Sequence, residues 1–273
     1  MIYLKKRFGQ HFLTDKNDLQ KILSYTGLSE SDVVLEIGAG SGLLTCELAK
    51  KVKKIYAIEI ERDALRLLKE NLEVNKIKNV ETIETDFLKL DINVLMQKSS
   101  FASLKIVGNI PYNITSPILI KLFGEIDSPA SHIKYLDEVY LMLQKEVAER
   151  FIAKSGTREY SPITILVQYF SNPKILFYVS KNSFYPSPKV ESAFVKFSLK
   201  KTFPKIADPK LLKKIIRTAF QHRRKKIVNA LQKIFTDKKE MERMLNALEI
   251  NLNSRPEDLE FSQYIKIADS MVS

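Results

Sequence analysis

The chain has 273 residues, 45% of them hydrophobic and 28% charged, and this composition excludes intrinsic disorder and fibrous folds. The 44 Lys and Arg residues outnumber the 32 Asp and Glu residues, and the formal charge of +12 indicates a polyanionic partner such as nucleic acid or an anionic membrane. A single cysteine, Cys46, excludes an internal disulfide, and with only three histidines we expect no metal centre. Apolar runs are too short to cross a bilayer and the N-terminus turns polar too early for a signal peptide, so we expect a cytoplasmic protein.

Short apolar or β-branched runs alternate with segments of helical spacing from residue 30 onward. Predicted strands span residues 33–37, 55–58, 80–84, 105–108 and 138–143. Predicted helices span residues 43–51, 62–72 and 118–124. Because this alternation is typical of a parallel sheet with crossover helices, we predict a doubly wound α/β domain.

The pattern changes after residue 170, where two further strands are predicted at residues 174–180 and 193–199. The loop between them carries Pro186 and Pro188, which fix an extended and stiff backbone. Beyond residue 209 the spacing is helical, over residues 211–220, 226–235, 239–248 and 261–271. Residues 201–273 hold 16 basic and 9 acidic side chains, more than half of the excess positive charge. We therefore divide the chain into a first domain of residues 1–200 and a basic helical domain of residues 201–273.

A glycine-rich turn follows the first predicted strand and precedes the first predicted helix. Gly38, Gly40 and Gly42 alternate with other residues there, and glycines let a backbone turn sharply against a ligand at a helix N-terminus. Leu43 stands where a dinucleotide-binding loop has a third small residue, which disfavours NAD. The turn predicts a site for a nucleotide-containing cofactor.

The ends of the next two strands carry acidic residues that suit an adenosine. Glu59 lies about 20 residues after the glycine turn, where a carboxylate accepts ribose hydroxyls. Asp86 follows the third strand and could accept the adenine amino group while Phe87 packs on the ring. Since open α/β sheets bind ligands at the carboxyl ends of their strands, we expect these side chains to share one site.

The fourth strand ends in Asn109, Ile110, Pro111 and Tyr112, a pattern typical of amino-group methyltransferases. The amino nitrogen of a base is a poor nucleophile, because its lone pair is delocalised into the ring. Two hydrogen-bond acceptors would favour a pyramidal nitrogen, and these are the Asn109 side-chain oxygen and a backbone carbonyl of Ile110 or Pro111. Tyr112 would stack on the base once it has left its helix.

Taken together, these motifs resemble the ribosomal RNA adenine N6,N6-dimethyltransferases, the small-subunit dimethyladenosine transferases. The resemblance covers nearly the whole chain and includes residues 7–13, 142–150, 184–193 and 219–227. It implies a Rossmann-like domain in which Gln10, His11 and Leu13 close over S-adenosylmethionine, and in which Phe184 covers the target adenine opposite Tyr112. His11, Ile110 and Ser187 stand where relatives often have Asn, Leu and Pro, which leaves the backbone acceptor open.

The resemblance also implies the reaction and the partner. Two methyl groups would pass to N6 of each of two adjacent adenosines in the 3′-terminal hairpin of small-subunit (16S) ribosomal RNA, with a role in the biogenesis of that subunit. In this context the basic helical domain binds RNA. Its phosphate contacts would come from Arg223, Arg224, Lys225 and Lys226, which are expected on a helix. We expect a monomer.

Three alternatives stay open at this point. A macrolide-resistance type of methyltransferase shares these motifs but modifies an adenosine of large-subunit RNA. A ribosome-assembly or transcription factor could keep the scaffold without catalysis, although Asn109, Tyr112 and Phe184 argue against a loss of activity. A nicotinamide-dependent dehydrogenase is supported only by Gly38, Gly40 and Glu59.

Overall fold

The computed structural model describes residues 11–99 and 101–272. The chain divides into two compact units. The first comprises the residues up to Phe123 together with Ala130–Ala148 and Ser171–Leu199, and the second comprises Gly124–Pro129, Glu149–Phe170 and Lys200–Ser273. The sequence places residues 149–170 in the first domain, whereas their contacts group them with the C-terminal helices.

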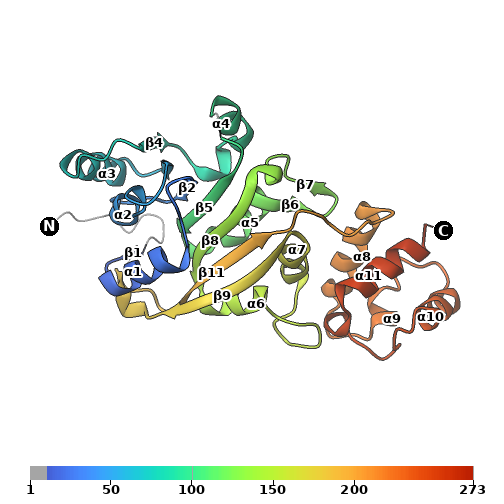
Figure 1. Ribbon diagram of the computed structural model, residues 1–273. Coiled ribbons are helices and arrows are strands. Elements are labelled where there is room, and N and C mark those ends of the chain that lie inside the picture. Colours follow the sequence, from blue (N-terminus) through green and yellow to red (C-terminus); the bar gives the residue numbers. More distant parts are fainter. Residues whose placement is uncertain (1–10, 100, 273) are drawn as a thin grey trace. The chain divides into compact units, whose positions relative to one another are not determined.

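A seven-stranded sheet forms the centre of the first unit (Figure 1). Its strands are β2 (Val33–Ile37), β3 (Lys54–Glu59), β4 (Val80–Glu84), β5 (Leu104–Asn109), β8 (Leu136–Gln144), β9 (Ser171–Val179) and β11 (Ser192–Leu199). Their order is β4-β3-β2-β5-β8-β11-β9, with parallel pairing from β4 to β8 and antiparallel pairing from β8 to β9. The strand order reverses between β2 and β5, and such a switch point leaves a crevice outside the carboxyl ends of the strands.

The predicted α/β fold class is confirmed, and the helices of the first unit follow their strands along the chain. They are α1 (Lys16–Tyr25), α2 (Leu43–Ala49), α3 (Arg62–Val74), α4 (Ile92–Lys98), α5 (Thr115–Phe123) and α6 (Lys145–Phe151), the last of which runs into the second unit. Side chains of α1, α2 and α3 form one buried cluster with side chains of β2, β3, β5 and β8. On the opposite face, Phe123 of α5 packs against Phe197 of β11, with ring centroids 6.0 Å apart.

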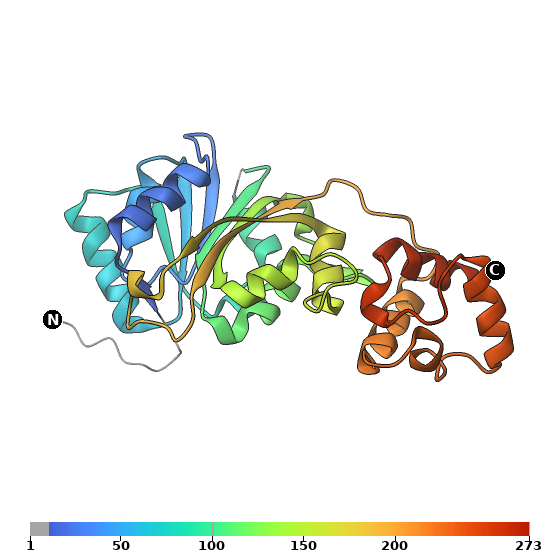
Figure 2. The ribbon, with the colours of Figure 1, turned by 90° about the horizontal axis from the view of Figure 1, so that it is seen from below.

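The C-terminal segment of the second unit is helical (Figure 2), and the unit also holds the short hairpin of β6 (Gly124–Glu125) and β7 (Ser128–Pro129) (Figure 1). Its helices are α7 (Pro162–Phe170), α8 (Pro209–Gln221), α9 (Ile227–Ala230), α10 (Lys238–Ala247) and α11 (Phe261–Ser270). The prediction of a helix over residues 226–235 is wrong, because the helix ends at Ala230. Asp237 begins the next helix by accepting a hydrogen bond from the Lys239 backbone nitrogen, so the chain has to turn between the two.

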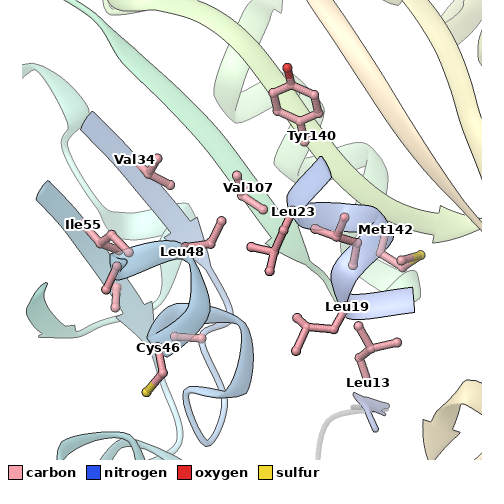
Figure 3. Packing of buried hydrophobic residues seen from close by; sticks show 14 of the residues in the cluster. Leu13, Leu19, Leu23, Val34, Cys46, Leu48, Ile55, Val107, Tyr140 and Met142 are labelled. Atoms are coloured by element: carbon pink, nitrogen blue, oxygen red, sulfur yellow. The ribbon is translucent and has the colours of Figure 1, made fainter. Parts of the chain in front are cut away.

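The buried cluster of the first unit includes Ala39, which lies within the glycine turn. Leu48 of α2 lies toward Val34 and Ile55 of the sheet, and Leu23 of α1 lies beside the neighbouring strands (Figure 3). The sequence analysis assigns no function to Cys46, and its side chain is buried in this cluster. The apolar packing therefore holds α2, and with it the glycine turn, against the ends of β2 and β3.

Two segments far apart in the sequence meet beside the sheet. Strand β1 (Phe12–Leu13) pairs with β10 (Phe184–Tyr185) in antiparallel register, with Phe12 opposite Tyr185. Five 3-10 turns complete the described part of the chain: η1 (Phe87–Lys89), η2 (Tyr112–Ile114), η3 (Ile133–Tyr135), η4 (Lys181–Ser183) and η5 (Pro256–Asp258). Among the described residues, no helix is both long and apolar enough to span a membrane.

Candidate active site

A pocket opens at the carboxyl ends of the parallel strands, around the switch point between β2 and β5. The pocket is open to solvent, and the space free of protein atoms is about 710 Å³ when the solvent at its mouth is included. The predicted site residues that line it are His11, Gly38, Gly40, Glu59, Asp86, Phe87, Asn109, Pro111 and Tyr112. Ile37, Ile58 and Ile118 give the pocket an apolar floor. Side chains predicted from separate motifs thus meet in one place.

The glycine turn has a backbone that only glycine adopts without strain. Gly40 has φ +56° and Gly42 has φ +90°. A Cβ at Gly40 would lie 3.0 Å from Cε1 of Phe12, and a Cβ at Gly42 would lie 2.5 Å from Cδ1 of Leu68. The turn therefore needs glycine both for its dihedral angles and for its close neighbours.

Glu59 is buried and fixes the shape of this turn. Its Oε2 accepts a hydrogen bond of 2.8 Å from the Gly40 nitrogen, and its Oε1 accepts bonds of 2.8 Å from the nitrogens of Ile60 and Glu61. Each carboxylate oxygen has two acceptor positions, so the contact with Gly40 leaves Oε2 able to accept a further hydroxyl. Glu59 thus holds the glycine turn in addition to lining the pocket.

Asp86 and Phe87 form the next wall. Oδ1 of Asp86 caps η1 by accepting a 3.0 Å bond from the Leu88 nitrogen, which fixes the carboxylate and leaves the second oxygen for a ligand. Phe87 is buried and presents part of its ring to the pocket. The arrangement suits a flat heterocycle that carries an amino group.

The Asn109 side chain is oriented by a contact across 98 residues of sequence. Its Nδ2 donates a 2.9 Å hydrogen bond to the His11 carbonyl. Because the amide nitrogen is engaged there, Oδ1 is the atom that can accept a hydrogen bond from a group in the pocket. Asn109 is thus held as an acceptor at the end of β5.

Tyr112 lies beside Asn109 and its ring position is also fixed. The hydroxyl groups of Tyr112 and Ser192 are 2.5 Å apart, and Ser192 is fully buried at the start of β11. The ring centroid of His11 lies 5.7 Å from that of Tyr112. Burial raises the pKa of Tyr112, so its hydroxyl stays protonated at neutral pH.

The N-terminal segment lies against the pocket only in part as predicted. His11 lines it, and its Nδ1 is 2.6 Å from the Pro186 carbonyl oxygen. Leu13 lines an adjoining cavity that shares Gly38, Gly40 and Asn109 with the pocket. Gln10 lies outside the described residues.

Phe184 is not brought to the pocket. Its side chain is only 3% exposed and belongs to the buried cluster beneath α1, opposite Leu13 in the pairing of β1 with β10. An aromatic pair of Phe184 and Tyr112 around one base is therefore not formed in this structure. The sequence cannot show this, because strand pairing across 171 residues decides which way the ring points.

Two residues of the site were not singled out from the sequence. Glu36 lines the adjoining cavity, is 2% exposed, and its Oε2 has no hydrogen-bond partner among the described residues. Burial, together with the nearby charge of Glu59, raises its pKa to about 8. The sequence did hold a signal for Glu36, because it is the one acidic residue in the otherwise apolar strand of residues 33–37. For Ser192, the partner of Tyr112, the only signal was its place in the segment 184–193.

The four predicted RNA-contacting residues lie in the second unit, in a turn after α8 and not on a helix as expected. Their sequence lacks apolar positions, and the backbone turns at His222, whose carbonyl accepts from the Lys225 nitrogen. Nε of Arg223 lies 3.4 Å from Glu257, and Nζ of Lys226 donates a 2.6 Å bond to Asn253. Arg224 and Lys225 are exposed. A separate cavity in the second unit is lined by Gly156, Thr157, Arg158, Arg223, Arg224, Arg255, Glu257 and Asp258.

Among the described residues, no group of three His, Cys, Asp or Glu side chains is placed to hold a metal ion. Comparison with known proteins identifies the family. The family model of ribosomal RNA adenine dimethylase matches residues 1–272. The chain is 38% identical over 269 residues to ribosomal RNA small subunit methyltransferase A of Caldanaerobacter subterraneus, which covers 98% of this chain and 97% of the relative.

A protein of the same name from Ligilactobacillus salivarius is 40% identical over 275 residues, covering 98% of this chain and 90% of the relative. The crystal structure of a dimethyladenosine transferase from Plasmodium falciparum matches with a TM-score of 0.77 and 28% identity, over 96% of this chain and 98% of that chain. The 23S rRNA methyltransferase ErmE shares the fold, with a TM-score of 0.71 at 22% identity, 96% coverage of this chain and 100% of that chain. From its sequence and its fold, this chain belongs to the ribosomal RNA adenine dimethylase family.

Proposed function

We propose that the protein transfers methyl groups from S-adenosylmethionine to N6 of two adjacent adenosines in the 3′-terminal hairpin of small-subunit ribosomal RNA, giving N6,N6-dimethyladenosine. The observation that carries this proposal is the bond from Asn109 to the His11 carbonyl, which leaves Oδ1 of Asn109 as an acceptor in the pocket that Tyr112 also lines. The relatives named ribosomal RNA small subunit methyltransferase A support the choice of subunit. We place its activity in the cytoplasm, on small ribosomal subunits.

The residues of the pocket fit S-adenosylmethionine. The glycine turn leaves no room for a Cβ at Gly40, the second oxygen of Asp86 suits the adenine amino group, and Oε2 of Glu59 suits a ribose hydroxyl. When bound, the cofactor supplies an activated methyl group on a sulfonium sulfur. The reaction therefore needs alignment more than it needs acid or base catalysis.

The protein's own contribution is to hold the adenine amino group. Oδ1 of Asn109 would accept one N–H, and a backbone carbonyl of Ile110 or Pro111 would accept the other, which favours a pyramidal nitrogen. Tyr112 would stack on the base, with its ring fixed through Ser192. The amino proton becomes acidic as the new C–N bond forms, so it can leave to water and Asn109 stays neutral.

The second unit supports RNA binding. Arg158, Arg223, Arg224 and Arg255 line one cavity although they come from three separate segments of the chain. Arginine guanidinium groups bind phosphate oxygens in a bidentate manner. We assign the phosphate contacts mainly to the exposed Arg224 and Lys225, because Arg223 and Lys226 already have partners within the protein.

Nucleoside mass spectrometry tests the proposal. The protein and S-adenosylmethionine are incubated with unmethylated small subunits and, in parallel, with large-subunit RNA. We expect dimethyladenosine in the small-subunit sample alone. Product from large-subunit RNA alone would assign the protein to the resistance type, and RNA binding without any product would assign it to ribosome assembly.

A further inference from the structure

Tyr185 is the most exposed aromatic side chain in the described part of the chain. It is 71% exposed, whereas its neighbour Phe184 is 3% exposed. Successive residues of a strand point to opposite faces, so Phe184 turns into the core and Tyr185 turns to solvent. The flat face of a large ring is thereby offered at the surface.

The backbone beneath this ring is held by several hydrogen bonds. The Ser183 carbonyl accepts a 2.8 Å bond from the Thr14 nitrogen, and the Ser183 hydroxyl donates a 2.6 Å bond to Asp18. On the other side of Tyr185, the Ser187 hydroxyl donates a 2.8 Å bond to the Lys181 carbonyl. An exposed ring on a fixed backbone loses little conformational freedom when it binds a partner.

The ring also lies next to the pocket. Tyr185 is paired with Phe12, which lines the pocket. The carbonyl oxygen of the following residue, Pro186, lies 2.6 Å from Nδ1 of His11, which also lines the pocket. The exposed cations Lys181 and Lys189 flank the segment. An aromatic face beside cations, at the rim of a base-binding pocket, is the combination that binds single-stranded nucleic acid.

We propose that Tyr185 stacks on the RNA base adjacent to the adenosine in the pocket. A base can react only after leaving its stack, and its neighbour then loses a stacking partner. In an adjacent pair of adenosines, that neighbour is the other adenosine, so Tyr185 holds one member of the pair while the other reacts. This proposal rests on the proposed function, and it makes Tyr185 a positioning residue and not a catalytic one.

The test combines a protein variant with an RNA variant. Small subunits are reconstituted with 16S RNA ligated to a synthetic 3′-terminal fragment that carries either adenosine or an abasic sugar beside the target adenosine. For the wild-type protein we expect the abasic site to lower kcat/KM about tenfold, within the range for loss of one stacked base. Tyr185→Ala should show a similar loss on the native RNA and no further loss on the abasic RNA. Tyr185→Phe should behave as the wild type.

The matched control is Tyr25→Ala, because Tyr25 is 50% exposed but its ring stacks on Phe177 of β9, which does not line the pocket, whereas Tyr185 is paired with the pocket-lining Phe12. Its kcat/KM should respond to the abasic site as the wild type does. The proposal would be overturned if the losses of kcat/KM from Tyr185→Ala and from the abasic site multiplied when the two were combined. Full activity of Tyr185→Ala on the native RNA would also overturn it. If the wild-type protein forms no methylated adenosine, the proposed function fails. The role of Tyr185 is then still decided by RNA-binding anisotropy, with the same protein variants measured on the native and the abasic RNA.

Discussion

Asn109 shows how one contact determines the role of a side chain. Its amide nitrogen donates one N–H to the His11 carbonyl at 2.9 Å, which fixes the side chain and leaves Oδ1 as the atom that can accept from an amino group. Asn109→Ala should lower methyl transfer by about 10²-fold or more, comparable to the loss of an oxyanion-type partner. Its affinity for S-adenosylmethionine should change only a few-fold, as measured by calorimetry.

The control for this prediction is Asn113→Ala, because Asn113 is exposed on η2 and does not line the pocket. Its methyl transfer rate should stay close to that of the wild type. A loss of cofactor affinity in Asn109→Ala as large as the loss of rate would show that Asn109 binds the cofactor and not the substrate.

Glu36 gives a prediction about pH. Its pKa is raised from 4.5 to about 8 by burial, so the folded protein holds this proton more tightly than the unfolded chain does. The proton on Glu36 therefore adds its full contribution to the free energy of unfolding below pH 4.5. This contribution is lost as the pH rises to about 8, at about 1.4 kcal/mol per pH unit. Glu36→Gln should remove this contribution. Urea unfolding of both proteins over this interval measures it, and parallel curves would contradict the assignment.

At the scale of elements, Gly40 and Gly27 form a natural comparison. Their φ angles are +56° and +55°, but a Cβ at Gly40 would lie 3.0 Å from Phe12 whereas a Cβ at Gly27 would meet nothing within 4 Å. Gly40→Ala and Gly27→Ala should each cost about 1 kcal/mol of stability through backbone strain. Only Gly40→Ala should also weaken S-adenosylmethionine binding, because it displaces Phe12. Equal cofactor affinity in the two variants would remove the glycine turn from the site.

The strands and their ends are the part of the structure that local sequence specifies. Strands β2 and β4 have the predicted bounds, since apolar runs bordered by polar residues mark them directly. Helix α1 is absent from the prediction although its signal is present, with Asp15 capping it and Leu19, Ile22 and Leu23 spaced for one buried face. The omission therefore reflects an unused signal and not a missing one.

The remaining features depend on contacts between distant segments. The bond from Asn109 to His11 and the burial of Phe184 involve residues in or next to the pairing of β1 with β10, and no local pattern specifies that pairing. The turn at Arg223 lies between α8 and α9, which pack on each other, whereas the sequence analysis expects the four cations on a helix. Sequence thus predicts which residues gather at the pocket but not how each one is oriented.

At the scale of the whole molecule, the excess positive charge should appear in the salt dependence of RNA binding. Arg224→Ala and Lys225→Ala should each reduce the slope of log K against log salt by about 1, since each removes one phosphate contact. Arg223→Ala should instead lower the stability of the second unit, because it removes the partner of Glu257. Filter binding across a salt series measures the slopes, and Lys78→Ala, an exposed lysine in the first unit, is the control.

An unchanged slope in both Arg224→Ala and Lys225→Ala would take this turn out of the RNA interface. The other arginines of the cavity would then be the next candidates, beginning with the exposed Arg158 and Arg255.

The switch point between β2 and β5 has a consequence for the geometry of the reaction. Gly38 follows β2 and Asn109 ends β5, and the two strands are paired with Ile37 opposite Gly108. Neighbouring strands lie about 4.8 Å apart, so the gap between the residues that we propose for the methyl donor and those that we propose for its acceptor is set by a backbone ladder. A flexible loop would let that gap fluctuate with temperature and with substrate. Here the sheet fixes the distance between the ends of β2 and β5. Substitutions at the mouth of the pocket can therefore change the RNA specificity without changing that distance.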